Sequence, residues 1–349
     1  MWNVTGRSHK IIVIGTSAGG MQALERLLAH LPADLPAAIF IVQHLSLDSS
    51  APFLVQRLGQ RAALACKVAV DKEGIKPGTI YLAPPDRHLL LKEEEMLVVR
   101  GPRENQFRPS IDPLLRSAAA YYGPHAIGVI LTGFLSDGVA GMEAIKRSGG
   151  KTVVQDPEDA EFAPLPQNVI RQVETDHVVA LDEMAELLVT LCHEPNQKAA
   201  NVPGDIWQEV QITERIMTNS AMNDIEELNK IGERVPYSCP ECGGSLWELT
   251  QPGTLKRYRC HTGHAYTQDS LLLSMTSHLE ETLWVAMRTL EERRNILLHM
   301  SQSDTEKGSR RWAELQEGRA EEMKVHIERL RELLARIALN DQEHIEKAS

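Results

Sequence analysis

The chain has 349 residues, enough for two or three domains and for a large apolar core. Its 37 lysines and arginines against 48 aspartates and glutamates give a formal charge of −11, which argues against a broad nucleic-acid-binding surface. No apolar run approaches the roughly 18 residues of a membrane span, and the N-terminus lacks the apolar core of a signal peptide. We therefore expect a cytoplasmic protein without nucleic-acid partners or direct membrane insertion.

The first expected strand ends in a glycine-rich turn that carries a serine. The apolar run 11–14 is followed by GTSAGG, in which Ser17 fits the G-x-S-x-G nucleophile-elbow pattern. The apolar residues after the turn recur at helical spacing: Met21, Leu24, Leu27, Leu28 and Leu31. The N–H groups of Gly19 and Gly20 would face a developing oxyanion. A phosphate-binding turn and a purely structural turn are the alternatives, although the spacing matches neither common phosphate-loop pattern.

A second buried strand, expected over 37–42, ends in Gln43 and His44. A helix joins this strand to the first one, so a right-handed crossover would place the two strand ends side by side. His44 is therefore a candidate general base for Ser17, although a lone histidine is more often structural.

Residues 45–113 contain a helical stretch and several short strands. We expect a helix over 51–64, then strands at CKVAV and TIYLAP and a hairpin from LLL and MLVVR, which together form an antiparallel addition to the sheet. His88 follows one of these strands and is a rival base. Before the next helix, Asp112 fits an N-cap and Pro113 the first helical position.

A third buried strand, expected over 125–131, leads into a loop and a helix that begins near Val139. Asp137 lies in this loop, at the same sheet edge as Ser17 and His44, and its alternative role is that of an N-cap. Further strands follow at TVVQ and HVVAL. This alternation of strands and helices predicts an α/β fold: a doubly wound, mostly parallel sheet with helices on both faces.

The composition changes at residues 194–204, which we interpret as a linker between an α/β domain (1–193) and a C-terminal α-helical domain (205–349). In the second domain we expect a helix near 205–234, a cysteine-bearing stretch over 237–266, and a helical hairpin or coiled coil over 268–345, with helices at 268–300 and 309–345. The helices could dock partners, control access to the active site or form a homo-oligomer.

Three of the five cysteines lie close together, in the stretches CPECGG and RYRCHTGHAY. Cys239, Cys242 and Cys260 with His264 have the spacing of a structural zinc ribbon, and His261 is the alternative fourth ligand. Three reduced cysteines without a metal are the other interpretation. The sequence thus predicts a small zinc-ribbon-like element inside the helical domain.

Ser17, His44 and Asp137 together could carry out acyl transfer to water. A serine hydroxyl needs a base to remove its proton during attack, and a carboxylate on the other imidazole nitrogen would orient that base. The order Ser, His, Asp differs from the Ser, Asp, His order of α/β-hydrolases, and only one strand precedes the elbow. We therefore do not expect the α/β-hydrolase fold.

Six stretches between residues 10 and 193 resemble, in their order and separations, the catalytic domain of the chemotaxis protein-glutamate methylesterase (CheB) family: IGTSAGG, IVQHLS, YLAPPDRHL, RPSID, GVILTGFLSDGVAGM and GGKTVVQDPEDAEFAPLPQNVI. The resemblance implies that the catalytic triad falls on Ser17, His44 and Asp137, with no catalytic cofactor. The family hydrolyses glutamate γ-methyl esters on chemoreceptor signalling helices, and many members also deamidate receptor glutamines. The implied partner is a methylated chemoreceptor cytoplasmic domain or a similar signalling protein.

Residues beside the triad are assigned to an oxyanion and substrate pocket: Thr16, Ala18, His88, Arg108 and Phe134. Three of the positions in this region depart from the family pattern. Phe134 and Leu135 stand where the family typically has methionine and glycine, and Ala18 stands where a hydroxyl residue is frequent. Only nine or so residues precede the first expected strand, so we expect no receiver domain, and no control by aspartyl phosphate within this chain.

Two further hypotheses stay open. A catalytically weak signalling or adaptor module could use the esterase fold to bind a receptor or partner protein, which the departures at Ala18, Phe134 and Leu135 favour and the complete triad disfavours. An esterase for a small molecule or a non-chemotaxis receptor is the third. Activity separates these interpretations.

Overall fold

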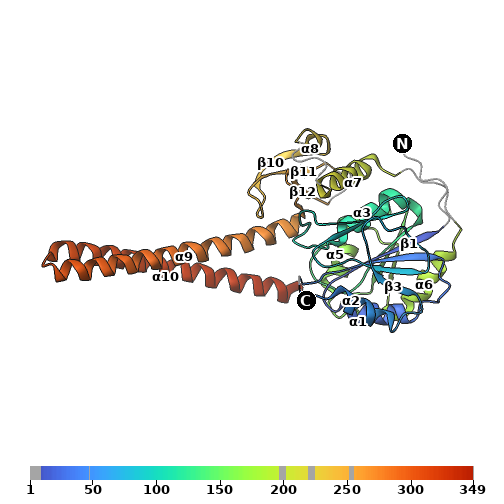
Figure 1. Ribbon diagram of the computed structural model, residues 1–349, viewed down its shortest axis with the longest axis horizontal. Helices are drawn as coiled ribbons and strands as arrows, with labels where there is room; N and C mark the ends of the chain where they lie inside the picture. Colours follow the sequence, from blue (N-terminus) through green and yellow to red (C-terminus); the bar gives the residue numbers. More distant parts are fainter. Residues whose placement is uncertain (1–8, 47, 196–201, 219–224, 251–254, 349) are drawn as a thin grey trace. The chain divides into compact units, whose positions relative to one another are not determined.

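The computed structural model describes residues 9–46, 48–195, 202–218, 225–250 and 255–348, with the side chains described up to residue 337. Its largest element is a seven-stranded sheet in which every pair of neighbouring strands is parallel (Figure 1). In spatial order the strands are β3 (Ala65–Val68), β4 (Thr79–Leu82), β2 (Ala37–Gln43), β1 (Lys10–Thr16), β7 (Ala126–Ile130), β8 (Lys151–Gln155) and β9 (His177–Val179). The predicted doubly wound α/β fold is confirmed.

The central strands are covered by helices on both faces. Every residue of β1 and β2 is buried, which explains why both strands are nearly continuous apolar runs rather than alternating ones. One apolar cluster contains residues of α1 (Gly20–Ala29), α2 (Ala51–Gly59) and α6 (Leu181–His193). The cluster on the other face contains residues of α3 (Ile111–Tyr122), α4 (Val139–Arg147) and α5 (Pro164–Gln172). A short 3₁₀ turn, Gly123–His125, joins α3 to β7.

The strand order reverses direction at β1. The chain proceeds from β1 to β2 on one side, and β7 later returns to the other side of β1. In open α/β sheets, a crevice forms outside the carboxyl ends of the strands at such a switch point. The ends of β1, β2 and β7 are therefore where side chains from distant segments meet.

The expected antiparallel addition to the sheet is wrong. Strands β3 and β4 extend the main sheet in parallel, while β5 (His88–Leu91) and β6 (Met96–Val99) form a separate two-stranded antiparallel sheet. One face of the hairpin packs into the same apolar cluster as α3, through Leu89, Leu91, Met96 and Val98. Short strands find their partners through such packing, which a local pattern does not reveal.

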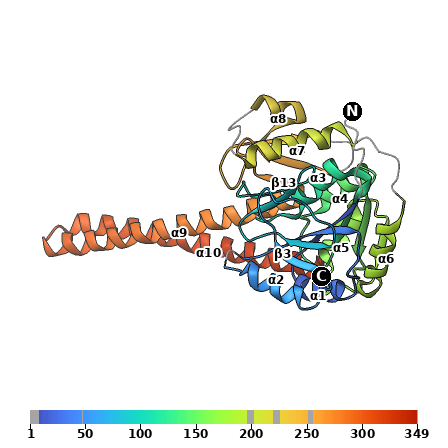
Figure 2. The same cartoon turned by 45° about the vertical axis from the view of Figure 1, so that its right-hand side comes forward.

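The segment after residue 201 contains two helices and a second sheet. The helix expected near 205–234 is in fact α7 (Gly204–Met217), α8 (Ile225–Ile231) and the start of a strand. Residues 196–201 of the expected linker lie outside the described residues. Four antiparallel strands, here called the ribbon, follow in chain order: β10 (Gly232–Ser238), β11 (Ser245–Leu249), β12 (Arg257–Cys260) and β13 (Ala265–Thr267). Helix α7 and the ribbon lie on the same side of the sheet as α3 (Figure 1 and Figure 2).

Five buried charged side chains, here called the charged seam, join α3, α7 and β12: Glu104, Arg116, Glu209, Arg257 and Arg259. The Glu104 carboxylate lies 2.5 Å from Arg116 and 2.8 Å from Arg259. Arg257 makes two hydrogen bonds to Glu209, of 2.5 and 2.6 Å. The ribbon is thus attached to the sheet domain by paired charges that water cannot reach.

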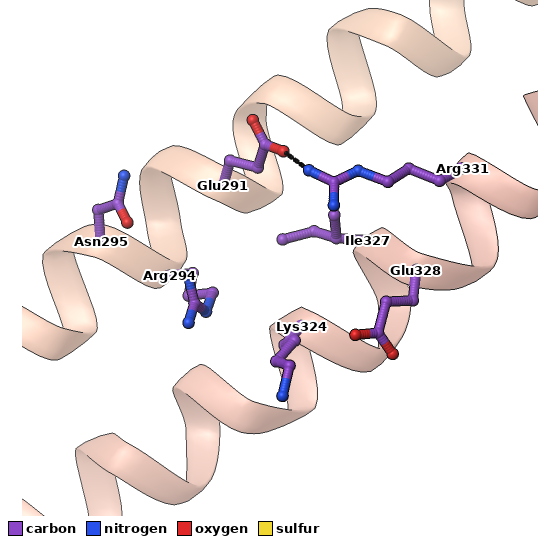
Figure 3. Close-up of a pocket in the computed structure, with 7 residues that line it drawn as sticks. All are labelled: Glu291, Arg294, Asn295, Lys324, Ile327, Glu328 and Arg331. Atoms are coloured by element: carbon purple, nitrogen blue, oxygen red, sulfur yellow. Dashed lines mark hydrogen bonds and ion pairs between the residues drawn. The ribbon is translucent and has the colours of Figure 1, made fainter.

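The last two helices, α9 (Gln268–Glu306) and α10 (Arg310–Ala348), confirm the expected pair of long helices. By compactness the chain divides between Leu271 and Leu272. Met287, Ile327 and Leu334 form the small apolar core between the helices, and an ion pair from Arg331 to Glu291 closes its edge (Figure 3). Among the described residues, no helix is both long and apolar enough to span a membrane.

Candidate active site

Ser17 stands in a sharp turn between β1 and α1. The turn reverses at Gly19, whose φ of 72° lies in the left-handed region that favours glycine. The Ser17 N–H donates to the Thr132 carbonyl at 3.1 Å, and Gln43 Nε2 donates to the Ser17 carbonyl at 2.7 Å. A Cβ at Gly133 would lie only 2.7 Å from Ser17 Cβ, so this neighbour must also be glycine. The ends of β2 and β7 therefore hold the serine in place.

His44 connects Ser17 to Asp137. Its Nδ1 lies 3.1 Å from Ser17 Oγ, and its Nε2 lies 2.7 Å from Asp137 Oδ2. The His44 side chain is 6% exposed and the Asp137 side chain is fully buried. The two imidazole nitrogens are used in the reverse of the order in the chymotrypsin triad. Because Asp137 accepts from Nε2–H, Nδ1 is left as the nitrogen that can take the serine proton.

The Asp137 carboxylate caps a helix other than its own. It accepts hydrogen bonds from the Ile111 N–H at 2.7 Å and the Ser110 hydroxyl at 2.8 Å, at the start of α3. Asn105 Nδ2 donates to it at 3.0 Å. Burial would raise the pKa of Asp137, but the hydrogen bond from His44, the charge of that imidazole, and the Ile111 and Asn105 donors hold it below its usual range.

Asp112 makes the reciprocal contact. It is not the N-cap of α3, as expected, because Ser110 occupies that position. Its Oδ1 instead accepts from the N–H groups of Gly138 (3.1 Å) and Gly141 (2.6 Å), at the start of α4. Burial and the nearby Asp137 charge raise the pKa of Asp112 to about 7. Each aspartate thus caps the helix next to the other one: Asp137 caps α3, and Asp112 caps α4. These reciprocal caps connect α3 to α4 beneath the site.

The backbone after Ser17 offers two N–H groups. Gly20 N–H donates to the Ser17 carbonyl at 3.1 Å, so the expectation that it faces an oxyanion is wrong. The N–H groups of Ala18 and Gly19 make no hydrogen bond within the described part of the chain. They are the donors best placed for an oxyanion that forms beside Ser17.

Two of the expected pocket residues, Thr16 and His88, lie beneath the site. Thr16 is fully buried and its hydroxyl donates to the Thr132 carbonyl at 2.9 Å. His88 is also fully buried, with Nε2 2.8 Å from the Pro102 carbonyl and Nδ1 accepting from the Ser110 N–H at 3.3 Å. Burial lowers the pKa of this imidazole. The structure does not bring His88 to Ser17, so it is not the rival base.

Arg108 is anchored by Asp86 and by the backbone of Gly101. Its Nε donates to Asp86 at 2.7 Å, and its guanidinium also donates to the Gly101 carbonyl at 2.7 Å. Its side chain is only 15% exposed. The structure therefore gives Arg108 a role in holding the loop before α3.

Ala18, Phe134 and Leu135 remain beside the nucleophile. Ala18 follows Ser17 directly, and Phe134 follows the glycine that touches it. The Phe134 ring is 37% exposed and packs on Phe162 with centroids 4.8 Å apart. Leu135 has a φ of 67°, which costs a non-glycine residue about 1 kcal/mol. The departure from glycine at Leu135 thus introduces backbone strain into the loop next to the site.

Sequence reasoning missed Asn105, Phe107 and the role of Ser110. The Phe107 ring stacks on His44 with centroids 3.6 Å apart and planes 10° apart. Ser110 belongs to the motif RPSID, which could have drawn attention to it. Asn105 and Phe107 lie in a loop with no expected element, and nothing in the local pattern singles them out.

A second cluster lies in the ribbon. One ligand atom from each of Cys239, Cys242, Cys260 and His264 lies within 4.8 Å of the others. The Cys242 and Cys260 sulfurs are 3.7 Å apart, and His264 Nδ1 lies 3.5 Å from Cys260 Sγ. A tetrahedral zinc site with Zn–S distances of roughly 2.3 Å requires sulfurs about 3.8 Å apart, so the residues fit this ion.

The fourth position of this cluster belongs to a single histidine. The structure brings His264 to the cysteines, whereas the His261 ring packs against Gly244. Glu241 lies 3.3 Å from His264 Nε2, the kind of contact that orients a metal-bound imidazole. The donor set Cys₃His is closed and suits a structural ion.

Comparison with known proteins gives one consistent result. The family model for CheB methylesterase matches residues 12–188. A relative from Leptospira interrogans, whose name places it among the protein-glutamate methylesterases/protein-glutamine glutaminases, is 41% identical over 185 residues, covering 53% of this chain and 95% of the relative. A protein-glutamate methylesterase/protein-glutamine glutaminase from Methanosarcina mazei is 36% identical, over 52% of each chain. The crystal structure of the Thermotoga maritima CheB methylesterase catalytic domain matches with a TM-score of 0.52 and 35% identity, over 53% of this chain and all of that one.

Proposed function

The chain belongs to the CheB methylesterase family, and from this premise we propose that it is a serine esterase that hydrolyses glutamate γ-methyl esters on chemoreceptor signalling domains. One observation carries the proposal: an unbroken line of hydrogen bonds from Ser17 through His44 to Asp137. Each of the three groups lies at or just beyond the end of a parallel strand, where this fold class places its chemistry. We assign the reaction to the domain within residues 1–193.

In the proposed acylation step, Ser17 Oγ attacks the ester carbonyl while His44 Nδ1 takes its proton. The Asp137 carboxylate, held ionised at the start of α3, stabilises the imidazolium that forms. The N–H groups of Ala18 and Gly19 would bind the tetrahedral oxyanion. The imidazolium then returns the proton to the methoxide as the C–O bond breaks, which releases methanol and leaves the glutamyl ester of Ser17.

Deacylation repeats the sequence with water. His44 removes a proton from a water molecule, the hydroxide adds to the acyl carbon, and the proton passes to Ser17 Oγ as the acyl bond breaks. A glutamine side chain would follow the same route with ammonia as the leaving group. The names of the relatives include both activities.

The partner class follows from the proposed reaction. The substrate is a carboxylate methyl ester on a protein, so the partner is the methylated cytoplasmic domain of a chemoreceptor or a similar signalling protein. The adaptor hypothesis is the second candidate, and the strained Leu135 beside the site favours it.

We also propose a structural zinc ion held by Cys239, Cys242, Cys260 and His264. The ribbon has only a small apolar core, which by itself contributes little stability. A bound metal ion would crosslink its strands and supply the missing stability. The ion would take no part in the reaction.

The esterase proposal is tested by methanol release from a methylated chemoreceptor cytoplasmic domain. We expect Ser17→Ala to lower the rate by about 10³-fold or more, because the nucleophile is lost. Ser46→Ala, which changes an exposed serine two residues after His44, is the matched control and should retain full activity. Equal, background-level release from all three proteins would favour the adaptor hypothesis.

The zinc proposal is tested by metal analysis of the purified protein. We expect about one zinc per chain, and loss of that zinc in Cys242→Ser. Cys66→Ser is the control, because Cys66 lies in β3, outside the cluster. Equal metal content in the two variants would contradict the assignment.

A further inference from the structure

Asn105 lies between the proposed catalytic carboxylate and the start of α9. Its Nδ2 donates to Asp137 Oδ1 at 3.0 Å and to Asp112 Oδ2 at 2.8 Å. Its Oδ1 accepts from the Thr267 N–H at 2.9 Å and from Ser270 Oγ at 2.8 Å. These four bonds use the full capacity of the amide, and Asn105 is only 3% exposed. If the amide were flipped, Nδ2 would face the Thr267 N–H and Oδ1 would face the two carboxylates, so only one orientation of the amide is favourable.

The backbone around Asn105 is strained and is held from the same side. Asn105 and Gln106 have φ values of 51° and 72°; asparagine tolerates this left-handed region, but it costs a residue such as Gln106 about 1 kcal/mol. The Asn105 N–H donates to the Ala265 carbonyl at 2.8 Å, and Gln106 Nε2 donates to the Ser270 carbonyl at 3.2 Å. The end of the ribbon and the first turn of α9 therefore keep this loop in a conformation that it would not adopt alone.

The same loop reaches two members of the triad. Asn105 bonds to Asp137, and two residues later the Phe107 ring stacks on His44. A parallel link runs from Ser136, next to Asp137, to the Thr267 hydroxyl at 2.9 Å. The loop that contains Asn105 and Phe107 thus connects the start of α9 to the Asp137 carboxylate and to the His44 imidazole.

We propose that Asn105 is a positioning residue for Asp137, and that Thr267 and Ser270 set its orientation. This inference rests on the proposed function and adds a route of control to it. Displacement of the junction between β13 and α9, which carries Thr267 and Ser270, removes two hydrogen bonds from Asn105 Oδ1 and lets the amide rotate away from Asp137. The reactivity of Ser17 then depends on how the start of α9 is seated.

The test measures labelling of Ser17 in the full-length protein by a fluorophosphonate probe, as a function of pH. Loss of a hydrogen bond to a carboxylate should slow labelling about 10- to 100-fold in Asn105→Ala, and loss of the neutral bond should slow it about 3- to 10-fold in Ser270→Ala. Asp137 loses the Asn105 donor in Asn105→Ala, and that donor is held less firmly in Ser270→Ala, so the acid limb of the pH profile should move to higher pH in both variants. Ser274→Ala, a buried serine one turn further along α9, is the matched control and should behave as the wild type.

Thermal midpoints and the fraction of labelled protein separate this role from a structural one. A merely structural contact would lower the folded fraction and leave the rate and pH profile of the folded protein unchanged, which would overturn the inference. It is also overturned if Ser270→Ala and Ser274→Ala label at the same rate. A wild-type chain that labels without releasing methanol overturns only the proposed substrate, whereas one that does not label overturns both proposals.

Discussion

The faces of the seven-stranded sheet and the charged seam are equally buried, but different forces hold them. Leu24 and Ile39 on one sheet face are fully buried among other apolar side chains. In the seam, Arg116 and Arg259 are 1% and 0% exposed, and both contact the Glu104 carboxylate. Apolar contacts are non-directional and numerous, so the loss of one leaves the others intact. The loss of one buried charge leaves its partner uncompensated.

This difference bears on function because the seam is next to the site. Glu104 precedes Asn105, the residue that we propose positions Asp137. A change in the seam should therefore alter both the free energy of unfolding and the position of the loop that contains Asn105. A small change in the sheet core should alter the free energy of unfolding alone.

The largest effect is expected from breaking the seam. Arg259→Met should lower the free energy of unfolding by about 3–5 kcal/mol, because Glu104 loses one of its two buried partners. Urea denaturation measures this change. Arg26→Met is the control: it removes an ion pair to Asp182 whose side chains are 52% and 71% exposed, and it should cost no more than about 1 kcal/mol. Equal losses would show that the seam behaves like the surface.

The second-largest effect is expected from acid, which should lower the stability that the charged seam contributes. Burial opposes ionisation of Glu104, but Arg116 and Arg259 lower its pKa to about 2. Because the folded-state pKa is depressed, this stabilisation is present above the unfolded pKa near 4.5 and is lost as pH falls towards 2. Between pH 7 and pH 3 we expect a loss of about 2 kcal/mol from this group, with the remainder lost at still lower pH. Urea midpoints between pH 7 and pH 3 provide the measurement, and Arg259→Met should show a shallower fall; a parallel fall would contradict the assignment to Glu104.

The smallest effect is expected in the sheet core. Ile39→Val removes one buried methyl group from β2 and should cost about 1 kcal/mol. Methanol release by the folded variant should stay at the wild-type level. Val178→Ala changes a residue of β9 that is 42% exposed and serves as the control, with an expected loss below about 0.5 kcal/mol. A loss at Ile39 as large as that at Arg259 would remove the contrast between the two regions.

Local pattern was sufficient for the elements that bring Ser17, His44 and Asp137 together. Apolar runs ending in a polar residue marked the strand ends, and parallel strands place those ends at one edge. Local pattern was misleading where an element's partner lies elsewhere in the chain. Asp112 matched an N-cap by position, but its carboxylate caps a helix that begins 27 residues later, at Val139. The strands β3 and β4 were recognised, but their parallel pairing was not.

The sequence by itself determined the alternation of strands and helices, the strand-end positions of the three candidate catalytic residues, and the cysteine and histidine spacing of the ribbon. These features depend on periodicity and spacing over a few residues, which a sequence displays directly. Only the tertiary structure decided that Asn105 bridges Asp137 to Ser270, that Glu104 lies between Arg116 and Arg259, and that His264 rather than His261 completes the cysteine cluster. Asn105 and Ser270 are separated by 165 residues, and a hydrogen bond across that separation arises from packing, which leaves no local pattern in the chain.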